Sequence, residues 1–129
     1  MPRSWATTEI LGAMTIDLTI LINKLRAFAR ERDWSQFHSP KNLASALSVE
    51  SGELLENFQW LTEEQSRDLN DAQKSAVAME IADVFIYLLQ LCDALEIDLL
   101  EAADNKIKLN EEKYPADRAR GNNKKYSDL

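Results

Sequence analysis

The sequence is poor in cysteine, histidine, glycine and proline, with one, one, three and three of each in 129 residues. A single cysteine excludes an intramolecular disulfide. Cys92 stands among leucines at helical spacing, which predicts a packed thiol in a reducing compartment. His38 lies in an unrelated segment, so the two residues do not form a zinc-binding pattern. So few glycines and prolines also disfavour a fold built from hairpins or sandwiches.

Positive charge and long apolar runs are scarce as well. Fifteen Lys and Arg against 22 Asp and Glu leave a net charge of −7, which argues against a nucleic acid polymer as partner. The most apolar N-terminal piece is interrupted by Asp17 and is too short and mixed for a membrane span. A Ser-His-Asp arrangement and a glycine-rich phosphate loop are both missing. We therefore expect a cytoplasmic protein without a membrane or nucleic acid partner.

A period of 3.6 residues recurs through the chain and predicts helices throughout. Asp17, the pair Ser39-Pro40, and Asp98 with Glu101 have the side chains and spacing of helix starts. The expected fold is an all-α, four-helix-bundle-type subunit in one domain, residues 1–129, with a lead-in at 1–16 and a polar tail at 115–129. The first helix is so apolar that we expect helices to be buried between subunits. The four helices are predicted at residues 17–32, 40–60, 72–95 and 98–113.

Two of the apolar helix stripes are interrupted by acids. Glu50 and Glu53 lie in the second stripe, and Glu80 and Asp83 lie in the third. Residues three apart project from the same side of a helix, so each helix presents two carboxylates together. Buried carboxylates must be paired, protonated or bound to a cation, and neither stripe contains a lysine or arginine. Mg²⁺ suits such oxygen ligands, and Mn²⁺ could use the same set. The alternative is that the acids lie at the stripe edges and pair with water or with tail lysines.

Cations and aromatic residues form two further groups. Lys106, Asn110 and Lys113 share one face of the fourth helix, as a phosphate chain would require, although most such rows are simply solvated. Aromatic residues in loops and at helix ends are suitable walls for a nucleobase, and are equally common as core or interface residues. His38 by itself is more typical of a hydrogen-bonded loop residue than of a catalyst. The candidate wall residues are Trp34, His38, Trp60 and Tyr87.

The combined pattern resembles a known family. Glu50-Ser51-Gly52-Glu53, a gap of 26 residues, and Glu80-Ile81-Ala82-Asp83 resemble the E-x-x-E…E-x-x-D signature of the MazG-like all-α nucleotide pyrophosphohydrolases. The resemblance covers about residues 25 to 129 and is greatest to the dCTP pyrophosphatase branch. Its other elements are Glu31-Arg32-Asp33-Trp34, Phe37-His38, Pro40, Asn42-Leu43, Phe58-Gln59-Trp60, Asp83-Val84, Ile86-Tyr87-Leu88, Lys106, Asn110, Tyr114-Pro115 and Lys125-Tyr126.

The resemblance implies Mg²⁺-dependent hydrolysis of a nucleoside triphosphate, with dCTP or a modified dCTP expected, to the monophosphate and pyrophosphate. It implies a homo-oligomer with sites between subunits, a tetramer rather than a dimer. By position, Glu50, Glu53, Glu80 and Asp83 would hold the metal. From the ligand set we expect Glu53 to bind it through water and to accept the proton. The implied substrate-binding residues are Trp34, His38, Trp60, Tyr87, Lys106, Asn110, Lys113, Lys125 and Tyr126.

Two alternatives use the same residues differently. A hydrolase of dUTP or phosphoribosyl-ATP would keep the carboxylates and change the base pocket. A non-catalytic helical interaction module would use the acids and aromatic residues as a partner surface. The sequence does not separate pool balancing from removal of damaged nucleotides.

Overall fold

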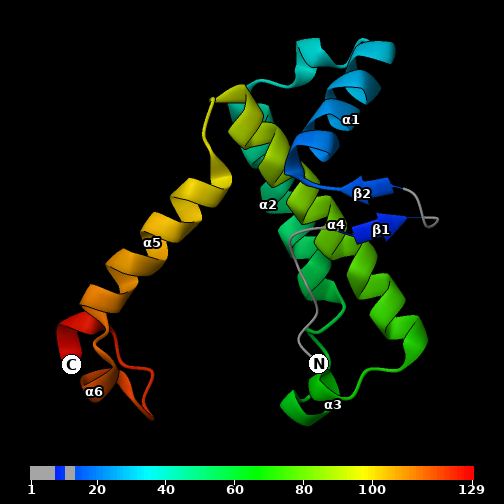
Figure 1. Cartoon of the computed structure of the whole chain (residues 1–129). Coiled ribbons are helices and arrows are strands. Elements are labelled where there is room, and N and C mark those ends of the chain that lie inside the picture. Colours follow the sequence, from blue (N-terminus) through cyan, green and yellow to red (C-terminus); the bar gives the residue numbers. More distant parts are fainter. Residues whose placement is uncertain (1–7, 11–13) are drawn as a thin grey trace. The chain divides into compact units, whose positions relative to one another are not determined.

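Helices make up most of the residues that the computed structural model describes, which are residues 8–10 and 14–129. The chain forms two compact units, Met1–Leu95 and Glu96–Leu129, and each is described by itself. The all-α class is confirmed, whereas the one-domain organisation stays a prediction. The first unit contains β1 (Thr8–Ile10), β2 (Met14–Ile16), α1 (Leu18–Glu31), the short 3₁₀ turn η1 (Ser35–Phe37), α2 (Pro40–Glu56), α3 (Glu63–Arg67) and α4 (Asp71–Ala94) (Figure 1). The second contains α5 (Leu99–Lys113), α6 (Ala116–Ala119) and the 3₁₀ turn η2 (Tyr126–Asp128).

The predicted helix starts are confirmed by their capping bonds. Asp17 Oδ1 accepts a hydrogen bond from the Ile20 amide at 2.9 Å, and Ser39 Oγ accepts one from Asn42 at 3.2 Å. Asp98 Oδ1 accepts from the Glu101 amide at 3.0 Å, which supplies one half of the predicted capping box. The antiparallel hairpin of β1 and β2, with Thr8 opposite Ile16, was not predicted.

The predicted end of the second helix is wrong by about one turn. Helix α2 ends at Glu56, with Asn57 as its C-cap, rather than at Trp60. The Asn57 side-chain amide donates to the Glu53 carbonyl at 3.2 Å, and the Phe58 amide bonds Leu55 three residues back. These bonds tighten the last turn, so residues 57–60 leave the helix axis.

Helix α4 is the central element of the first unit. Helix α2 packs along it and α1 packs against it more locally (Figure 1). Four hydrophobic side chains are buried in the part of the chain whose burial is described: Ala29, Leu43, Leu89 and Cys92. The predicted packing of Cys92 is thus confirmed, and burial raises the pKa of its thiol. Length and composition alone would also let α4 cross a membrane, which is weak evidence because core helices of soluble proteins pass the same test.

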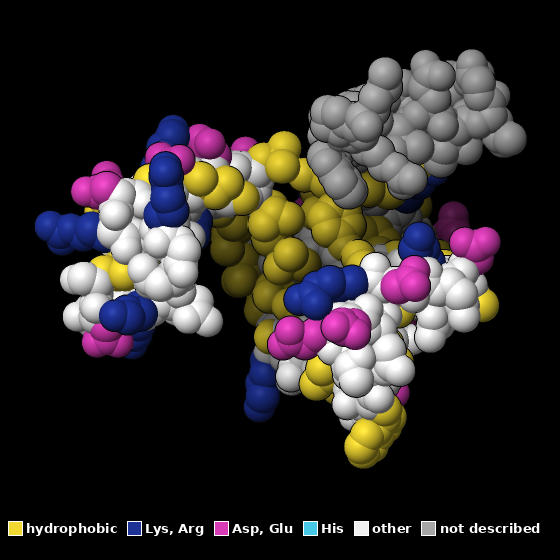
Figure 2. Space-filling model, turned by 90° about the horizontal axis from the view of Figure 1, so that it is seen from below, with side chains coloured by type: hydrophobic (Ala, Val, Ile, Leu, Met, Phe, Trp, Pro, Cys, Tyr) yellow, Lys and Arg dark blue, Asp and Glu magenta, His cyan; other side chains and the backbone are white. Residues whose placement is uncertain are grey.

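Large apolar side chains remain exposed on both units. Figure 2 shows hydrophobic side chains exposed at the surface beside charged ones. Trp60 is 87% exposed and Met79 is 66% exposed. Four buried side chains among residues 16–129 are few for a chain of this length. Others exposed include Val49, Leu55, Ile81, Leu100 and Ile107.

Candidate functional site

Three carboxylates from two helices come together where α2 packs along α4. One oxygen each of Glu50, Glu80 and Asp83 lies within 4.8 Å of the other two. Glu80 and Asp83 are three residues apart, which places both on one side of α4. Glu50 faces them from α2. We call Glu50, Glu80 and Asp83 the carboxylate cluster.

The cluster lies in a partly dry environment with unsatisfied oxygens. Glu50 Oε2 and Glu80 Oε2 are buried and have no hydrogen-bond partner. A hydrogen bond with Glu53, partial burial and the neighbouring carboxylates raise the pKa of Glu50 to about 7. Burial and the charges of Glu53, Asp83 and Glu56 raise the pKa of Glu80. Among the described residues no lysine or arginine forms an ion pair with Glu50, Glu80 or Asp83, so their negative charge lacks a partner there.

Glu53 takes a different position from the other three predicted ligands. It is exposed and lies outside the cluster, although its carboxyl group acts on the pKa values of both Glu50 and Glu80. The inward side chain of that turn is Leu54, which is half-buried. Of the four predicted metal ligands, three therefore form the cluster, and Glu53 lies beside it.

The donor set fits a divalent metal ion. Carboxylate oxygens are the ligands that hard cations such as Mg²⁺ prefer. Two buried oxygens without partners would gain their missing interactions from such an ion. The cluster could therefore hold a divalent cation through Glu50, Glu80 and Asp83.

A cavity of about 610 Å³ begins at Asp83 and runs between α1, α4 and the loop after α1. Three of the four predicted wall residues line it, namely Trp34, His38 and Tyr87. We call it the front cavity. Phe28 meets the Trp34 ring edge-on, with 5.7 Å between centroids, so the aromatic wall is braced by α1. The structure thus brings the predicted aromatic wall and one predicted metal ligand into one cavity.

Trp60 is not part of this wall. His38 precedes α2 and Trp60 follows it, and the 17 residues of α2 span about 25 Å at 1.5 Å per residue. Both residues cannot therefore line one small cavity within a single chain. Within a single subunit, therefore, Trp60 does not line the pocket that His38 lines, contrary to the prediction.

The remaining predicted residues belong to the second unit. Lys106, Asn110 and Lys113 lie on α5, and Lys125 precedes η2. The Lys113 ammonium lies 5.1 Å from the centre of the Tyr126 ring, which itself packs edge-on against Tyr114. Lys113 and Tyr126 therefore lie together in the second unit, whereas the carboxylate cluster belongs to the first.

Nine of the residues that line the front cavity were not predicted as site residues, and among them are Lys24, Phe28 and Gln90. Lys24 follows Leu21 by three residues and precedes Phe28 by four, so a cation on the apolar face of the first helix was a visible signal. Gln90 follows Tyr87 by three residues on α4. Its amide gave no signal by itself, because glutamine is common on solvated helix faces.

Comparison with known proteins gives consistent results. The model of the MazG-like family matches residues 45–129. dCTP pyrophosphatase 1 of Homo sapiens is 42% identical over 111 residues, and that of Mus musculus is 43% identical. Each alignment covers 84% of this chain and 65% of the relative, so the chain spans less than two thirds of these relatives' length. A crystal structure of a pyrophosphatase from Archaeoglobus fulgidus matches with a TM-score of 0.72 and 45% identity, over 76% of this chain and 92% of that one.

Proposed function

The chain belongs to the MazG-like family, and from this premise we propose that it is a nucleoside triphosphate pyrophosphohydrolase. Its expected substrate is dCTP or a modified dCTP, converted to the monophosphate and pyrophosphate. The observation that carries the proposal is the carboxylate cluster at one end of an aromatic cavity, with Asp83 in both. Similarity to proteins named dCTP pyrophosphatase and pyrophosphatase supports the same reaction.

The reaction is a displacement at the α-phosphorus. The oxygen of water forms a bond to that phosphorus, the bond to the bridging oxygen of the β-phosphate breaks, and pyrophosphate leaves with the electron pair. The water proton passes to a carboxylate, and Glu53 is the proposed acceptor because it lies beside the cluster and is exposed to solvent.

Glu50, Glu80 and Asp83 would hold the metal ion, for which Mg²⁺ is proposed and Mn²⁺ is an alternative. When bound, the ion would neutralise the carboxylates and the charge that develops on the phosphate oxygens. Without it, the raised pKa values of Glu50 and Glu80 indicate carboxylates that repel each other and would repel a triphosphate.

The nucleoside is proposed to occupy the front cavity. Trp34 and Tyr87 supply aromatic surface for the base, and His38 supplies a polar group. Lys106, Asn110, Lys113, Lys125 and Tyr126 are proposed to contact the phosphates or the sugar, as the family resemblance implies.

Activity is proposed to require a homo-oligomer, a tetramer rather than a dimer. The small buried set and the exposed apolar side chains on α2, α4 and α5 support burial against further copies of the chain. Because Trp60 cannot join His38 within one subunit, it is proposed to complete the base site of a neighbouring subunit. A cytoplasmic location stays a prediction.

The first experiment measures pyrophosphate release from dCTP, dUTP, phosphoribosyl-ATP and modified deoxycytidine triphosphates, with Mg²⁺, with Mn²⁺ and with EDTA. We expect metal-dependent release that is fastest for a dCTP-type substrate. Faster release from dUTP or phosphoribosyl-ATP would support the other hydrolases. No release from any of these by folded protein would contradict the activity and favour the interaction module.

The subunit arrangement is tested by mixing two variants, one with weakened nucleotide binding and one without turnover, at a substrate concentration well below KM. Trp60→Ala should weaken binding of the nucleotide by about fivefold to a hundredfold, since stacking on a base contributes about 1–3 kcal/mol. Trp60→Ala mixed with Asp83→Asn, after dissociation and reassembly, should regain activity because some sites then contain neither substitution. Trp60→Ala alone, taken through the same dissociation and reassembly, is the matched control. A mixture no more active than the Trp60→Ala control would contradict the shared site.

A further inference from the structure

Helix α4 carries three polar side chains along the face that lines the front cavity. Asp83, Tyr87 and Gln90 follow one another at spacings of four and three residues, so they share one side of the helix. Asp83 belongs to the carboxylate cluster, and Tyr87 belongs to the aromatic wall. Gln90 is the next polar residue on this face, and neither the cluster nor the aromatic wall uses its amide.

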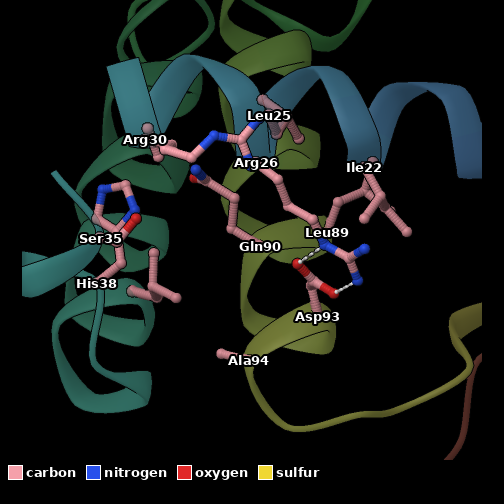
Figure 3. Close-up of a pocket in the computed structure, with 12 residues that line it drawn as sticks. Ile22, Leu25, Arg26, Arg30, Ser35, His38, Leu89, Gln90, Asp93 and Ala94 are labelled. Carbon is pink, nitrogen blue, oxygen red and sulfur yellow. Dashed lines mark hydrogen bonds and ion pairs between the residues drawn. The ribbon is translucent and has the colours of Figure 1, made fainter. Parts of the chain in front are cut away.

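The side-chain amide of Gln90 is available for a ligand. Gln90 is half-buried, and its side chain forms no hydrogen bond within the described residues. Arg26, on the facing helix α1, instead bonds Asp93, with Nε at 2.8 Å from Oδ2. Figure 3 shows the end of the Gln90 side chain turned toward His38 and away from that ion pair, beside a smaller cavity of about 370 Å³ that both residues also line. One amide oxygen and one amide NH2 group are therefore left for an occupant of the front cavity.

The backbone at Gln90 is held by core packing. Its neighbour Leu89 is 1% exposed, and Gln90 lies inside α4, one turn before that helix ends at Ala94. A polar group on a packed helix is placed more precisely than one on a loop. Gln90 is therefore well suited to recognise one particular edge of a ligand.

The distance along α4 relates these side chains to a nucleotide. Asp83 and Gln90 are seven residues apart, which is about 10 Å along the helix axis, and Tyr87 lies between them. A nucleotide with its α-phosphate at the carboxylate cluster and its base on Tyr87 would extend along this face. The base edge remote from the sugar would then reach Gln90. In a pyrimidine that edge carries N3 and the group at position 4.

We propose that Gln90 is the residue that reads this edge of the base, through N3 and the group at position 4. The proposal rests on the proposed function for the position of the phosphates. With cytosine, the amide oxygen accepts a hydrogen bond from the exocyclic amine, and the amide NH2 donates to N3. With uracil, the amide turns over, so that its NH2 donates to the oxygen at position 4 and its oxygen accepts from N3–H.

This geometry determines what Gln90 selects. No hydrogen bond within the described residues fixes the amide in one of its two orientations. Gln90 therefore selects a base with a hydrogen-bonding group at position 4 and does not choose between cytosine and uracil. A preference for dCTP over dUTP then comes from other residues of the site.

The test compares kcat/KM for three substrates in the wild type and in Gln90→Met. The substrates are dCTP, dUTP and the deoxyribonucleoside triphosphate of 2-pyrimidinone, whose base has only hydrogen at position 4. Methionine is unbranched and suits a helix but cannot pair with the base. We expect the wild type to prefer dCTP over the analogue by about fivefold, because one hydrogen bond is missing. Gln90→Met should lower the values for dCTP and dUTP by about tenfold each, and reduce the preference for dCTP over the analogue to about one.

Gln73→Met is the matched control. Gln73 lies in the first turn of the same helix, bonds Asn70 and lines neither cavity, so its substitution should leave all three values unchanged. Equal losses for all three substrates in Gln90→Met would overturn the proposal, because Gln90 would then act on the packing of the site. Unchanged values would overturn it too, because the amide would then face the smaller cavity or solvent. A loss for dCTP without a loss for dUTP would overturn the turning over of the amide.

Binding of the products gives a readout that does not need turnover. Calorimetry with dCMP and the 2-pyrimidinone monophosphate should show tighter binding of dCMP in the wild type, and Gln90→Met should remove the difference. That result without pyrophosphate release from any triphosphate would overturn the proposed activity and leave the role of Gln90 standing. Pyrophosphate release with equal binding of the two monophosphates to the wild type would overturn the role of Gln90 alone.

Discussion

Asp83 and Asp93 lie ten residues apart on α4 and have opposite surroundings. Asp83 faces two other carboxylates, and the pKa of Glu80 beside it is raised. Asp93 faces Arg26, whose hydrogen bond holds the pKa of the Asp93 carboxyl below its usual range. One helix thus carries an acid that destabilises the metal-free chain and an acid that stabilises it. Unneutralised charge retained inside a fold indicates a ligand, whereas a paired charge indicates structure.

The largest expected effect comes from substituting Asp83. Asp83→Asn should lower kcat for pyrophosphate release by on the order of 10³-fold or more, because it removes a carboxylate aimed at developing charge. Unfolding without metal should show no loss of stability, since one repulsive charge is removed. Asp71→Asn, an exposed acid in the first turn of α4, is the control and should keep its activity. Near-normal turnover of Asp83→Asn at saturating Mg²⁺ would remove Asp83 from the site.

A second substitution separates proton transfer from metal binding. Glu53→Gln should lower kcat by about 10²-fold or more, as loss of a general base does, while Mg²⁺ still binds. It should also lower the pKa of Glu50, because the hydrogen bond with Glu53 is the main cause of its rise. Kinetics and a Mg²⁺ titration followed by calorimetry measure the two effects. Loss of Mg²⁺ binding in Glu53→Gln would instead make Glu53 a direct ligand.

The dependence of metal-free stability on pH extends the comparison. The pKa of Glu50 is about 7 in the folded chain against an ordinary 4.5, so the folded state binds more protons between these values. The free energy of unfolding should therefore fall as the pH rises from 4.5 to 7. Relative to Glu50→Gln, the wild type should lose about 2–4 °C in Tm over this range. Thermal unfolding in EDTA measures the loss, and saturating Mg²⁺ should abolish it. An identical pH profile in Glu50→Gln would assign the effect to other groups.

The smallest expected effect concerns the Arg26–Asp93 pair. The two side chains are 57% and 27% exposed, so solvent screens much of their attraction. The pKa of Asp93 is lowered by Arg26, so the stabilisation is present above its ordinary value of 3.8 and is lost as the pH falls through the lowered value. Arg26→Met should lower the urea midpoint of unfolding at neutral pH. The loss in free energy of unfolding should be smaller than the loss that the wild type shows relative to Glu50→Gln between pH 4.5 and pH 7. A double-mutant cycle with Asp93→Asn isolates the pair, and a zero coupling energy would contradict its contribution.

The sequence alone determined the helices and the acids. Capping residues such as Asp17, Ser39 and Asp98 act on amides three residues away, so helix starts can be predicted from local sequence. The spacing of Glu80 and Asp83 is likewise a local property, because positions three apart share a helix face. The end of α2 was predicted too late, because the bonds of Asn57 and Phe58 compete with helical continuation to a degree that periodicity does not reveal.

Only the tertiary structure decided which of these residues meet. The packing of α2 on α4 brings Glu50 to Glu80 and Asp83 and leaves Glu53 exposed, a choice that depends on the rotation of one helix against the other. The crossing of α1 over α4 added Lys24, Phe28 and Gln90 to the cavity and paired Arg26 with Asp93, 67 residues apart. Contacts between distant segments depend on how helices pack, and a sequence period states only which face is apolar, not which face it meets.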